Sequence, residues 1–285
     1  MKFLVLGCNG MAGHMISQYL HERGHEVMGF ARTKSKYVPS ICGDARDLVL
    51  IKEVIENGRY DSVINAIGIL NQFAEENKAN AVFMNAYLPH YLADVTFGTN
   101  TQIIHMSTDC VFSGKRGDYT EDDFRDGEIF YDRSKALGEL EDAKNITLRN
   151  SIVGPDINPN GIGLLNWFMK QNSEVNGFTK VMWTGQTTLQ LAKTMEVAAK
   201  EKAHGLYNTV PDYSISKYEL LKLFNFYLRN DAIKINPIEG VNADKSLKRT
   251  RFEFNCLIPD YELMVAELAV WVKEHKDMYL HYWIK

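Results

Sequence analysis

A cluster of glycines near the start of the chain constrains the fold more than any other feature. The run Phe3–Leu6 has the length and apolar character of a buried strand, and Gly7-Cys8-Asn9-Gly10-Met11-Ala12-Gly13 links it directly to a segment with helical spacing. Glycines here permit a tight turn, and the first amides of the helix attract a pyrophosphate. The spacing differs from the usual G-x-G-x-x-G, and alone it also fits a plain strand–helix turn. Its place after the first strand favours a dinucleotide site formed by Gly7, Asn9, Gly10, Met11 and Gly13.

Strand-like and helix-like segments alternate through the first half of the chain. After Phe3–Leu6 we expect strands at Glu26–Phe30, Ser62–Ala66, Gln102–Ser107 and Ile146–Arg149, and helices at Met11–Arg23, Asp47–Asn57, Lys78–Thr96 and Tyr131–Ala143. This order predicts an α/β fold with a doubly wound, Rossmann-type parallel sheet.

The pattern loosens after about residue 150, where glycines and prolines cluster. We expect three later helices, at Thr188–Lys200, Ser216–Arg229 and Asp260–His275, and Ser216 with Glu219 forms a capping-box pattern. We therefore predict a dinucleotide-binding domain over 1–150 and a smaller C-terminal substrate-binding lobe over 151–285, some of whose elements pack back on the first domain.

Composition narrows the classes of function. A net charge of −4 argues against general nucleic-acid binding, and no apolar run is long enough to cross a membrane. The four cysteines are scattered, which favours free thiols in a cytoplasmic protein. His21 and His25 match the spacing H-E-x-x-H, but Gly24 should end the helix between them, so we expect no metal site.

The end of the second expected strand bears on the choice of cofactor. NAD enzymes place an acidic residue there to bind the ribose hydroxyls, whereas this chain has Arg32, which suits a 2′-phosphate. The sequence thus favours NADPH, and NADH remains open. Asp44 and Ala45 follow the next loop and could contact the adenine; Asp44 fits a helix cap equally well.

Tyr131 and Lys135 lie four residues apart, on one face of an expected helix. A protonated lysine stabilises a phenolate and lowers the pKa of the tyrosine, which can then act as an acid or base. Thr108 or Ser107, at the end of the preceding strand, can hold the substrate oxygen. A Tyr-x-x-x-Lys pair alone is weak evidence, but its place after a phosphate loop and a Ser-Thr strand end makes the combination specific.

At these residues the chain resembles the extended short-chain dehydrogenases/reductases, and within them the dTDP-4-dehydrorhamnose reductases and related nucleotide-sugar reductases. The likeness covers most of the chain and is densest up to residue 155. It is carried by Gly7-x-x-Gly10-x-x-Gly13, Asn65-Ala66-Ile67-Gly68, Asn85-Ala86, Ser107-Thr108-Asp109-Cys110-Val111-Phe112, Tyr131 to Glu139, Leu148-Arg149 and Trp183-Thr184-Gly185-Gln186-Thr187-Thr188.

The resemblance implies NADPH-dependent reduction of the keto group of a nucleotide-linked 4-keto-6-deoxy sugar. Tyr131 would donate the proton, and Lys135 would tune Tyr131 and bind the nicotinamide ribose. Thr108, with Ser107 behind it, would hydrogen-bond the substrate. The matched segments add Ala66 and Gly68 for the cofactor, and Asn85 and Trp183 for the substrate.

Two departures and two rival functions accompany this interpretation. Cys110 stands where the family often has tyrosine, and it cannot supply the acid that a dehydratase uses; the segment Gly161–Trp183 fits the rhamnose branch poorly. A nucleotide-sugar epimerase of the same fold uses the same tyrosine and lysine. A non-catalytic regulatory subunit with this fold is the other alternative. The sequence leaves open, for all of these functions, whether the protein forms a homodimer.

Overall fold

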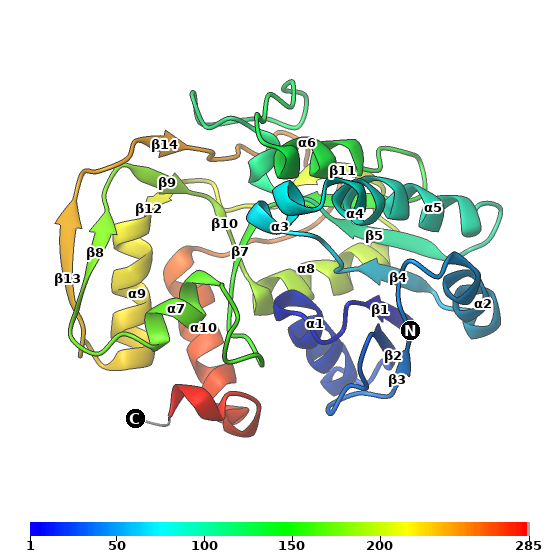
Figure 1. Ribbon diagram of the computed structural model, residues 1–285, viewed down its shortest axis with the longest axis horizontal. Coiled ribbons are helices and arrows are strands. Elements are labelled where there is room, and N and C mark those ends of the chain that lie inside the picture. Colours follow the sequence, from blue (N-terminus) through cyan, green and yellow to red (C-terminus); the bar gives the residue numbers. More distant parts are fainter. Residues whose placement is uncertain (284–285) are drawn as a thin grey trace.

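The computed structural model describes residues 1–283, and a seven-stranded parallel sheet lies at its centre (Figure 1). The strand order is β11-β6-β5-β4-β1-β2-β3, which confirms the predicted Rossmann-type α/β fold. The order reverses between β1 and β4, so the carboxyl ends of these two strands form the switch point at which such sheets bind ligands. The strands are β1 (Lys2–Leu6), β2 (Glu26–Ala31), β3 (Ser40–Cys42), β4 (Ser62–Asn65), β5 (Gln102–Met106), β6 (Ile146–Arg149) and β11 (Gly205–Asn208).

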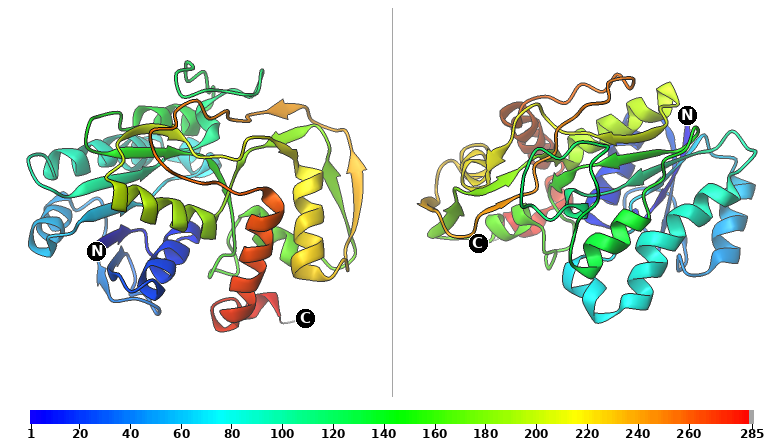
Figure 2. Two further views of the ribbon diagram at one scale, coloured as in Figure 1. Left: turned by 180° about the vertical axis from the view of Figure 1, so that it is seen from behind. Right: turned by 90° about the horizontal axis from the view of Figure 1, so that it is seen from above.

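Helices cover both faces of this sheet (Figure 2). Because successive residues of a strand point to opposite faces, β1 contributes to two cores. Phe3 and Val5 pack in the core beneath α1 (Met11–Glu22) and α8 (Thr188–Glu201). Leu4 and Leu6 pack in the opposite core, with α2 (Leu48–Gly58) and α5 (Leu88–Val95). The continuous apolar run of β1 follows from this burial on both sides.

The predicted helix Lys78–Thr96 is helical over 78–95 but changes its winding. It consists of α4 (Lys78–Ala81), the π-helix η1 (Val82–Tyr87) and α5. Pro89 has no N–H to donate to the carbonyl of Asn85, four residues earlier, and the wider turn lies just before this proline. The π-helix places Asn85 beside the next helix in the layer, α6 (Phe130–Leu137).

The predicted helix Tyr131–Ala143 is too long, because α6 ends at Leu137 and Gly138 is its C-terminal cap. A Cβ atom on Gly138 would lie 1.9 Å from the carbonyl oxygen of Asn85, so only glycine permits this contact between α6 and the π-helix.

Three other helix boundaries follow the expected chemistry. Gly24, with φ +79°, lies just beyond the end of α1, as predicted. Ser216 and Glu219 form the predicted capping box at the start of α9 (Lys217–Arg229). Asp260 caps α10 (Tyr261–Glu274). The three helices predicted after residue 150 are confirmed as α8, α9 and α10, within one residue at each end.

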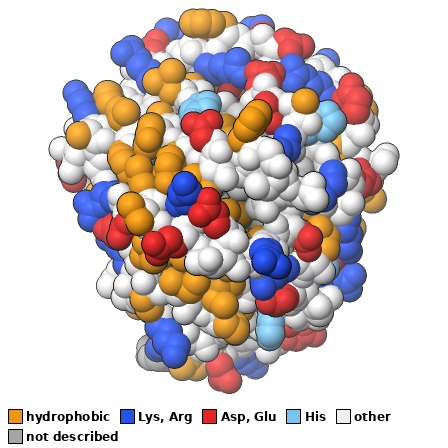
Figure 3. All heavy atoms as spheres, turned by 90° about the vertical axis from the view of Figure 1, so that its right-hand side faces the viewer, with side chains coloured by type: hydrophobic (Ala, Val, Ile, Leu, Met, Phe, Trp, Pro, Cys, Tyr) orange, Lys and Arg blue, Asp and Glu red, His pale blue; other side chains and the backbone are white. Residues whose placement is uncertain are grey.

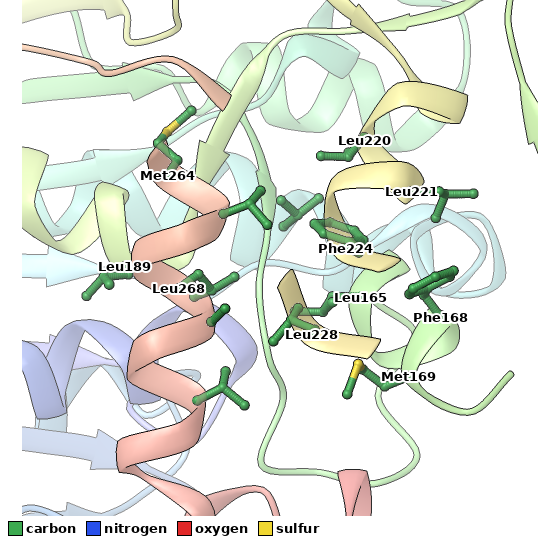
Figure 4. Close-up of a cluster of buried hydrophobic side chains, with 14 of the residues drawn as sticks. Leu165, Phe168, Met169, Leu189, Leu220, Leu221, Phe224, Leu228, Met264 and Leu268 are labelled. Atoms are coloured by element: carbon green, nitrogen blue, oxygen red, sulfur yellow. The ribbon is translucent and has the colours of Figure 1, made fainter. Parts of the chain in front are cut away.

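The C-terminal lobe also contains short strands that the sequence did not predict. They form a pair of β7 (Ser151–Val153) with β10 (Gly185–Thr187), a pair of β8 (Glu174–Phe178) with β13 (Lys234–Ile238), and a small sheet of β12 (Ile215–Ser216), β9 (Val181–Trp183) and β14 (Ala243–Asp244). The core of this lobe joins α7 (Leu164–Met169) to α9 and α10; Figure 4 shows Phe168, Phe224 and Leu268 among its side chains. The remaining short helices are α3 (Asn71–Glu76), η2 (Asp109–Val111), η3 (Lys276–Met278) and η4 (Leu280–Tyr282).

The chain passes between the two lobes more than once. Strand β11 is at the edge of the main sheet and α8 packs on α1, although both follow residue 150. Residues 284 and 285 of the predicted lobe lie outside the described residues. Over residues 1–283, none of the helices combines the length and the apolar character needed to cross a bilayer.

Candidate active site

The glycine loop is wrapped tightly around the start of α1. Gly7 has φ +83°, and its N–H donates to the carbonyl of Phe30 at 2.8 Å. A Cβ atom on Gly13 would lie 2.1 Å from the carbonyl oxygen of Gly7, so the third glycine lets α1 pack directly on the loop. The side chain of Asn9 donates to the carbonyl of Thr33 at 2.9 Å, which ties the loop to the segment after β2. This arrangement suits a pyrophosphate at the start of the helix.

A cleft of about 700 Å³ opens beside this loop at the switch point of the sheet. Eight of the predicted cofactor residues line it: Gly7, Asn9, Gly10, Arg32, Asp44, Ala45, Ala66 and Gly68. Sequence reasoning missed Ile67, Ile69 and Met84, which also line the cleft. The alternation of small residues with isoleucine after β4, in Ala66-Ile67-Gly68-Ile69, could have identified the two isoleucines. A second cleft of about 730 Å³, around Tyr60 and Gln102 at the opposite edge of the sheet, contains none of the predicted site residues.

Four predicted cofactor residues do not line the 700 Å³ cleft. Gly13 lies behind the loop, against the backbone of Gly7. Met11 faces a loop of the C-terminal lobe, because its sulfur would lie only 2.9 Å from a Cβ atom added to Gly163. Tyr131 and Lys135 lie beyond Ile69, which lines the cleft and packs against the cluster that contains Tyr131.

The mouth of the cleft carries positive charge. Arg32 is exposed there and forms no hydrogen bond or ion pair with the rest of residues 1–283. Asp44 accepts hydrogen bonds from the side chain and backbone of Arg46, which lower its pKa to about 2. The alternative of Asp44 as a helix cap is wrong, because Asp47 caps α2 by accepting from the N–H of Leu50. The free guanidinium of Arg32 and the glycine cradle fit a dinucleotide with a 2′-phosphate.

Tyr131 and Lys135 are both buried on α6, with 6% and 5% of their surface exposed. The ammonium of Lys135 donates to the carbonyl of Met106 at 2.6 Å, and burial lowers its pKa to about 8. Burial also raises the pKa of Tyr131 well above its usual value, although hydrogen bonding by Thr108 lowers it in part. Burial sets this net rise, so Tyr131 does not show the net lowering of its pKa that the sequence predicts. The phenol keeps its proton at neutral pH, as a proton donor must.

Two neighbouring hydroxyl groups have different tasks. Ser107 donates to Glu139 at 2.5 Å, and Glu139 forms a buried ion pair with Arg149 at 2.7 Å. Thr108 accepts from the N–H of Cys110 and donates to the carboxylate of Asp109 at 3.0 Å. Thr108 is also the hydroxyl that can hydrogen-bond to Tyr131, while Ser107 secures the strand end behind it.

Asn85 does not lie where a substrate could reach it. It is fully buried; its side chain accepts from the N–H of Ile69 at 2.8 Å and donates to the carbonyl of Ile69 and to Ser134. We correct its assignment accordingly: Asn85 positions the segment after β4 against α6.

Trp183 is also mostly buried, with 3% of its surface exposed. Its ring packs in the core of the C-terminal lobe near Tyr261, and the ammonium of Lys217 lies 5.2 Å from the ring centroid. A direct contact with substrate is therefore restricted to a small part of the side chain.

Cys110 lies one residue beyond the Thr108-Asp109 pair, and burial raises its pKa to about 12. It therefore remains a neutral thiol at neutral pH. His21 and His25 do not share a helix, because α1 ends at Glu22 and His25 contacts Glu196 at 3.0 Å.

Comparison with known proteins agrees with this geometry. The family described as RmlD substrate binding domain matches residues 1–253. A dTDP-4-dehydrorhamnose reductase of Aggregatibacter actinomycetemcomitans is 25% identical over 255 residues, covering 84% of this chain and 82% of the relative. A probable low-salt glycan biosynthesis reductase of Haloferax volcanii is 31% identical over 143 residues, 49% of this chain and 48% of that protein.

Among solved structures, a dTDP-4-dehydrorhamnose reductase from Bacillus anthracis, in complex with NADP, superposes with a TM-score of 0.79 at 19% identity, over 95% of this chain and 100% of the other. At that identity the likeness concerns the fold. With a family match over most of its length and the same fold, the chain belongs to the RmlD substrate binding domain family.

Proposed function

We propose that this protein uses NADPH to reduce the keto group of a nucleotide-linked 4-keto-6-deoxy sugar. The observation that carries the proposal is the buried phenol of Tyr131, one helical turn before Lys135 and separated from the dinucleotide cleft by Ile69. The names of the relatives, which are sugar-nucleotide and glycan reductases, support the same reaction class.

The glycine loop, Asn9, Ala66 and Gly68 would hold the cofactor, and Arg32 would bind its 2′-phosphate. When bound, NADPH supplies the hydride. The phenol of Tyr131 holds the keto oxygen by a hydrogen bond, and Thr108 does so too when its single hydroxyl proton turns from Asp109 to the substrate. Tyr131 gives the keto oxygen its proton as negative charge develops on it.

Lys135 acts after the proton has left Tyr131. Its pKa of about 8 keeps it mostly protonated at neutral pH, and the carbonyl of Met106 holds its ammonium in place. A fixed positive charge in a buried site stabilises the resulting phenolate far more than it would in water. We also assign to Lys135 a contact with the nicotinamide ribose.

We propose 1–150 as the dinucleotide-binding part and 151–285 as the main source of substrate contacts, and a cytoplasmic location, where NADPH and free nucleotide sugars are found. A homodimer is supported by exposed apolar side chains. Figure 3 shows such side chains gathered at the end of the molecule that carries α2 and α5, and Val49, Tyr87 and Phe97 on or beside these helices are 69%, 48% and 85% exposed. Sedimentation at several concentrations, with Tyr87→Glu as the disrupting variant, tests this pairing.

The reaction is tested with a panel of dTDP- and UDP-linked 4-keto-6-deoxy sugars. We expect stoichiometric loss of NADPH and formation of the 6-deoxy hexose product. Interconversion of sugar epimers without net NADPH use would instead establish the epimerase. An absence of turnover with every sugar, in a protein that binds NADPH, would favour the regulatory subunit.

A further inference from the structure

The dinucleotide cleft carries a negative charge beside Arg32, the residue proposed to bind the 2′-phosphate. Three of the residues that line this cleft are charged: Arg32, Asp44 and Arg46. Pairing of β3 with β2 brings the first two close together, because Ala31 pairs with Cys42 and the N–H of Gly43 donates to the carbonyl of Ala31 at 3.0 Å. Arg32 and Asp44 therefore follow the ends of two neighbouring strands, at the same edge of the sheet.

The carboxylate of Asp44 is ionised at neutral pH, since hydrogen bonds from Arg46 lower its pKa to about 2. A phosphate monoester carries about 1.5 to 2 negative charges at the same pH. A carboxylate on the neighbouring strand repels such a phosphate and offsets the single positive charge of Arg32. Arg32 and Asp44 by themselves would thus leave this part of the cleft without net charge.

Arg46 supplies the charge that changes this balance. Its Nε donates to the two carboxylate oxygens of Asp44 at 3.0 and 3.1 Å, and its Nη2 donates to Oδ2 at 2.5 Å. Its backbone N–H donates to Oδ1 at 2.9 Å. These bonds hold the guanidinium and the carboxylate in one fixed arrangement. With Arg46 in place, the charged residues of the cleft contribute two positive charges and one negative charge, a net charge of +1.

The stability of the fold gives little reason for this pair. The side chains of Arg46 and Asp44 are 62% and 35% exposed, and ion pairs so exposed contribute little to stability. The start of α2 does not depend on the pair either, because Asp47 is its cap. Both members of the pair line the cleft, so their position favours a role in binding the cofactor.

We infer that Arg46 determines the preference for NADPH over NADH without touching the 2′-phosphate, because it neutralises Asp44 and leaves the charge of Arg32 to the phosphate. NADH carries a hydroxyl group in place of this phosphate, so its binding depends much less on the charge at this point. The inference rests on the proposed use of NADPH, and it makes Arg46 a specificity-determining residue that acts through Asp44.

The test measures the affinity of NADPH and of NADH by fluorescence titration, with no sugar present. The ratio of the two affinities is used because contacts common to both cofactors cancel in it. Arg46→Gln should lower this ratio by about 10-fold, the size of effect that Coulomb's law gives for one charge near a phosphate at a partly exposed site. Adding Asp44→Asn to Arg46→Gln should restore the ratio. Arg46→Lys keeps the positive charge and should keep the ratio.

Arg116→Gln is the matched control. The side chain of Arg116 is 58% exposed and pairs with Asp123 at 2.5 Å, which resembles the pair of Arg46 with Asp44 in exposure and distance. Arg116 does not line the dinucleotide cleft. Its replacement removes the same charge from the protein, and the ratio of affinities should not change.

An unchanged ratio in a folded Arg46→Gln protein would overturn the inference. So would a lowered ratio that Asp44→Asn does not restore, because Arg46 would then bind the phosphate itself. Equal affinity of the parent for both cofactors would overturn the proposed use of NADPH and the inference together, whereas a failure to reduce sugars leaves this binding test unaffected. Asp44→Asn alone decides the matter where Arg46→Gln does not fold: the ratio should rise, since Arg46 then keeps its full charge, and an unchanged ratio would overturn the inference.

Discussion

Replacing Tyr131 with phenylalanine removes one hydroxyl and leaves the ring in its packing against Ala74 and Ala81. If this phenol is the proton donor, its removal leaves the alkoxide formed by hydride addition without the hydroxyl group that protonates it. Loss of a general acid costs about 10²- to 10⁴-fold in kcat. The fold should hardly change, since at most one hydrogen bond worth about 1 kcal/mol is lost.

Tyr119→Phe is the matched control, because Tyr119 is equally buried, with 4% of its surface exposed, and stacks on Phe112 at 4.3 Å. Its hydroxyl accepts from the backbone N–H groups of Lys115 at 3.1 Å and Arg116 at 3.3 Å. Removing it leaves these amides without that acceptor, at a cost of about 1–3 kcal/mol.

The two variants should therefore show opposite patterns. Tyr131→Phe should keep its melting temperature and NADPH affinity while kcat falls at least about 10²-fold. Tyr119→Phe should lose about 2–4 °C in Tm for each kcal/mol and keep kcat. The assay is steady-state NADPH oxidation with a 4-keto sugar nucleotide, beside thermal unfolding and cofactor titration. Near-parental kcat in a folded Tyr131→Phe protein would refute the assignment of the proton donor.

Three further predictions concern the dinucleotide cleft and the helix behind it. Arg32→Asp should weaken NADPH binding by about 10-fold or more and reverse the preference over NADH, because it replaces the partner of the 2′-phosphate with a like charge; equal affinity of the parent for both cofactors in a fluorescence titration would contradict this. Gly13→Ala should lower Tm and NADPH affinity, because the added Cβ would lie 2.1 Å from the carbonyl oxygen of Gly7. Gly68→Ala is the control: the atom nearest to its added Cβ is 3.7 Å away, so Tm should not change. Burial lowers the pKa of His14 from 6.5 to about 4, so between these pH values the unfolded chain binds a proton that the folded protein does not, and stability falls as pH falls. His14→Gln should therefore flatten the dependence of Tm on pH between pH 6.5 and 4. An unchanged slope in this variant would show that His14 is not the source of the pH dependence.

The sequence predicted those parts of the fold and site that depend on local chemistry. The turn at Gly7, the end of α1 near Gly24 and the cap at Ser216 each follow from a backbone requirement or a hydrogen bond within a few residues. The helical spacing of Tyr131 and Lys135 is also local. Periodicity could not predict strands such as β12, which has only two residues and exists because it pairs with β9.

The interpretation of Asn85 was wrong for a different reason. Its place in a matched segment indicated that the residue matters, but not which group it contacts. Only the folded chain brings it to Ile69 and Ser134, which are 16 and 49 residues away. The end of α6 could have been placed better, because a glycine at position 138 is a strong helix-ending residue.

Ser107, Glu139 and Arg149 also lie within the segments that carry the resemblance, and there too the sequence indicated that the residues matter but not which groups they contact. The side chains of Glu139 and Arg149 are 2% and 0% exposed, and although burial alone would raise the pKa of Glu139, the guanidinium of Arg149 holds it below its usual value. A buried charge whose partner is removed costs about 3–5 kcal/mol, so each residue of this pair requires the other. Since Ser107 donates to Glu139, the pair fixes the end of β5, and with it the position of Thr108 beside Tyr131. These residues serve the reaction through the position of Thr108, which neither spacing nor residue type could distinguish from a direct contact with substrate.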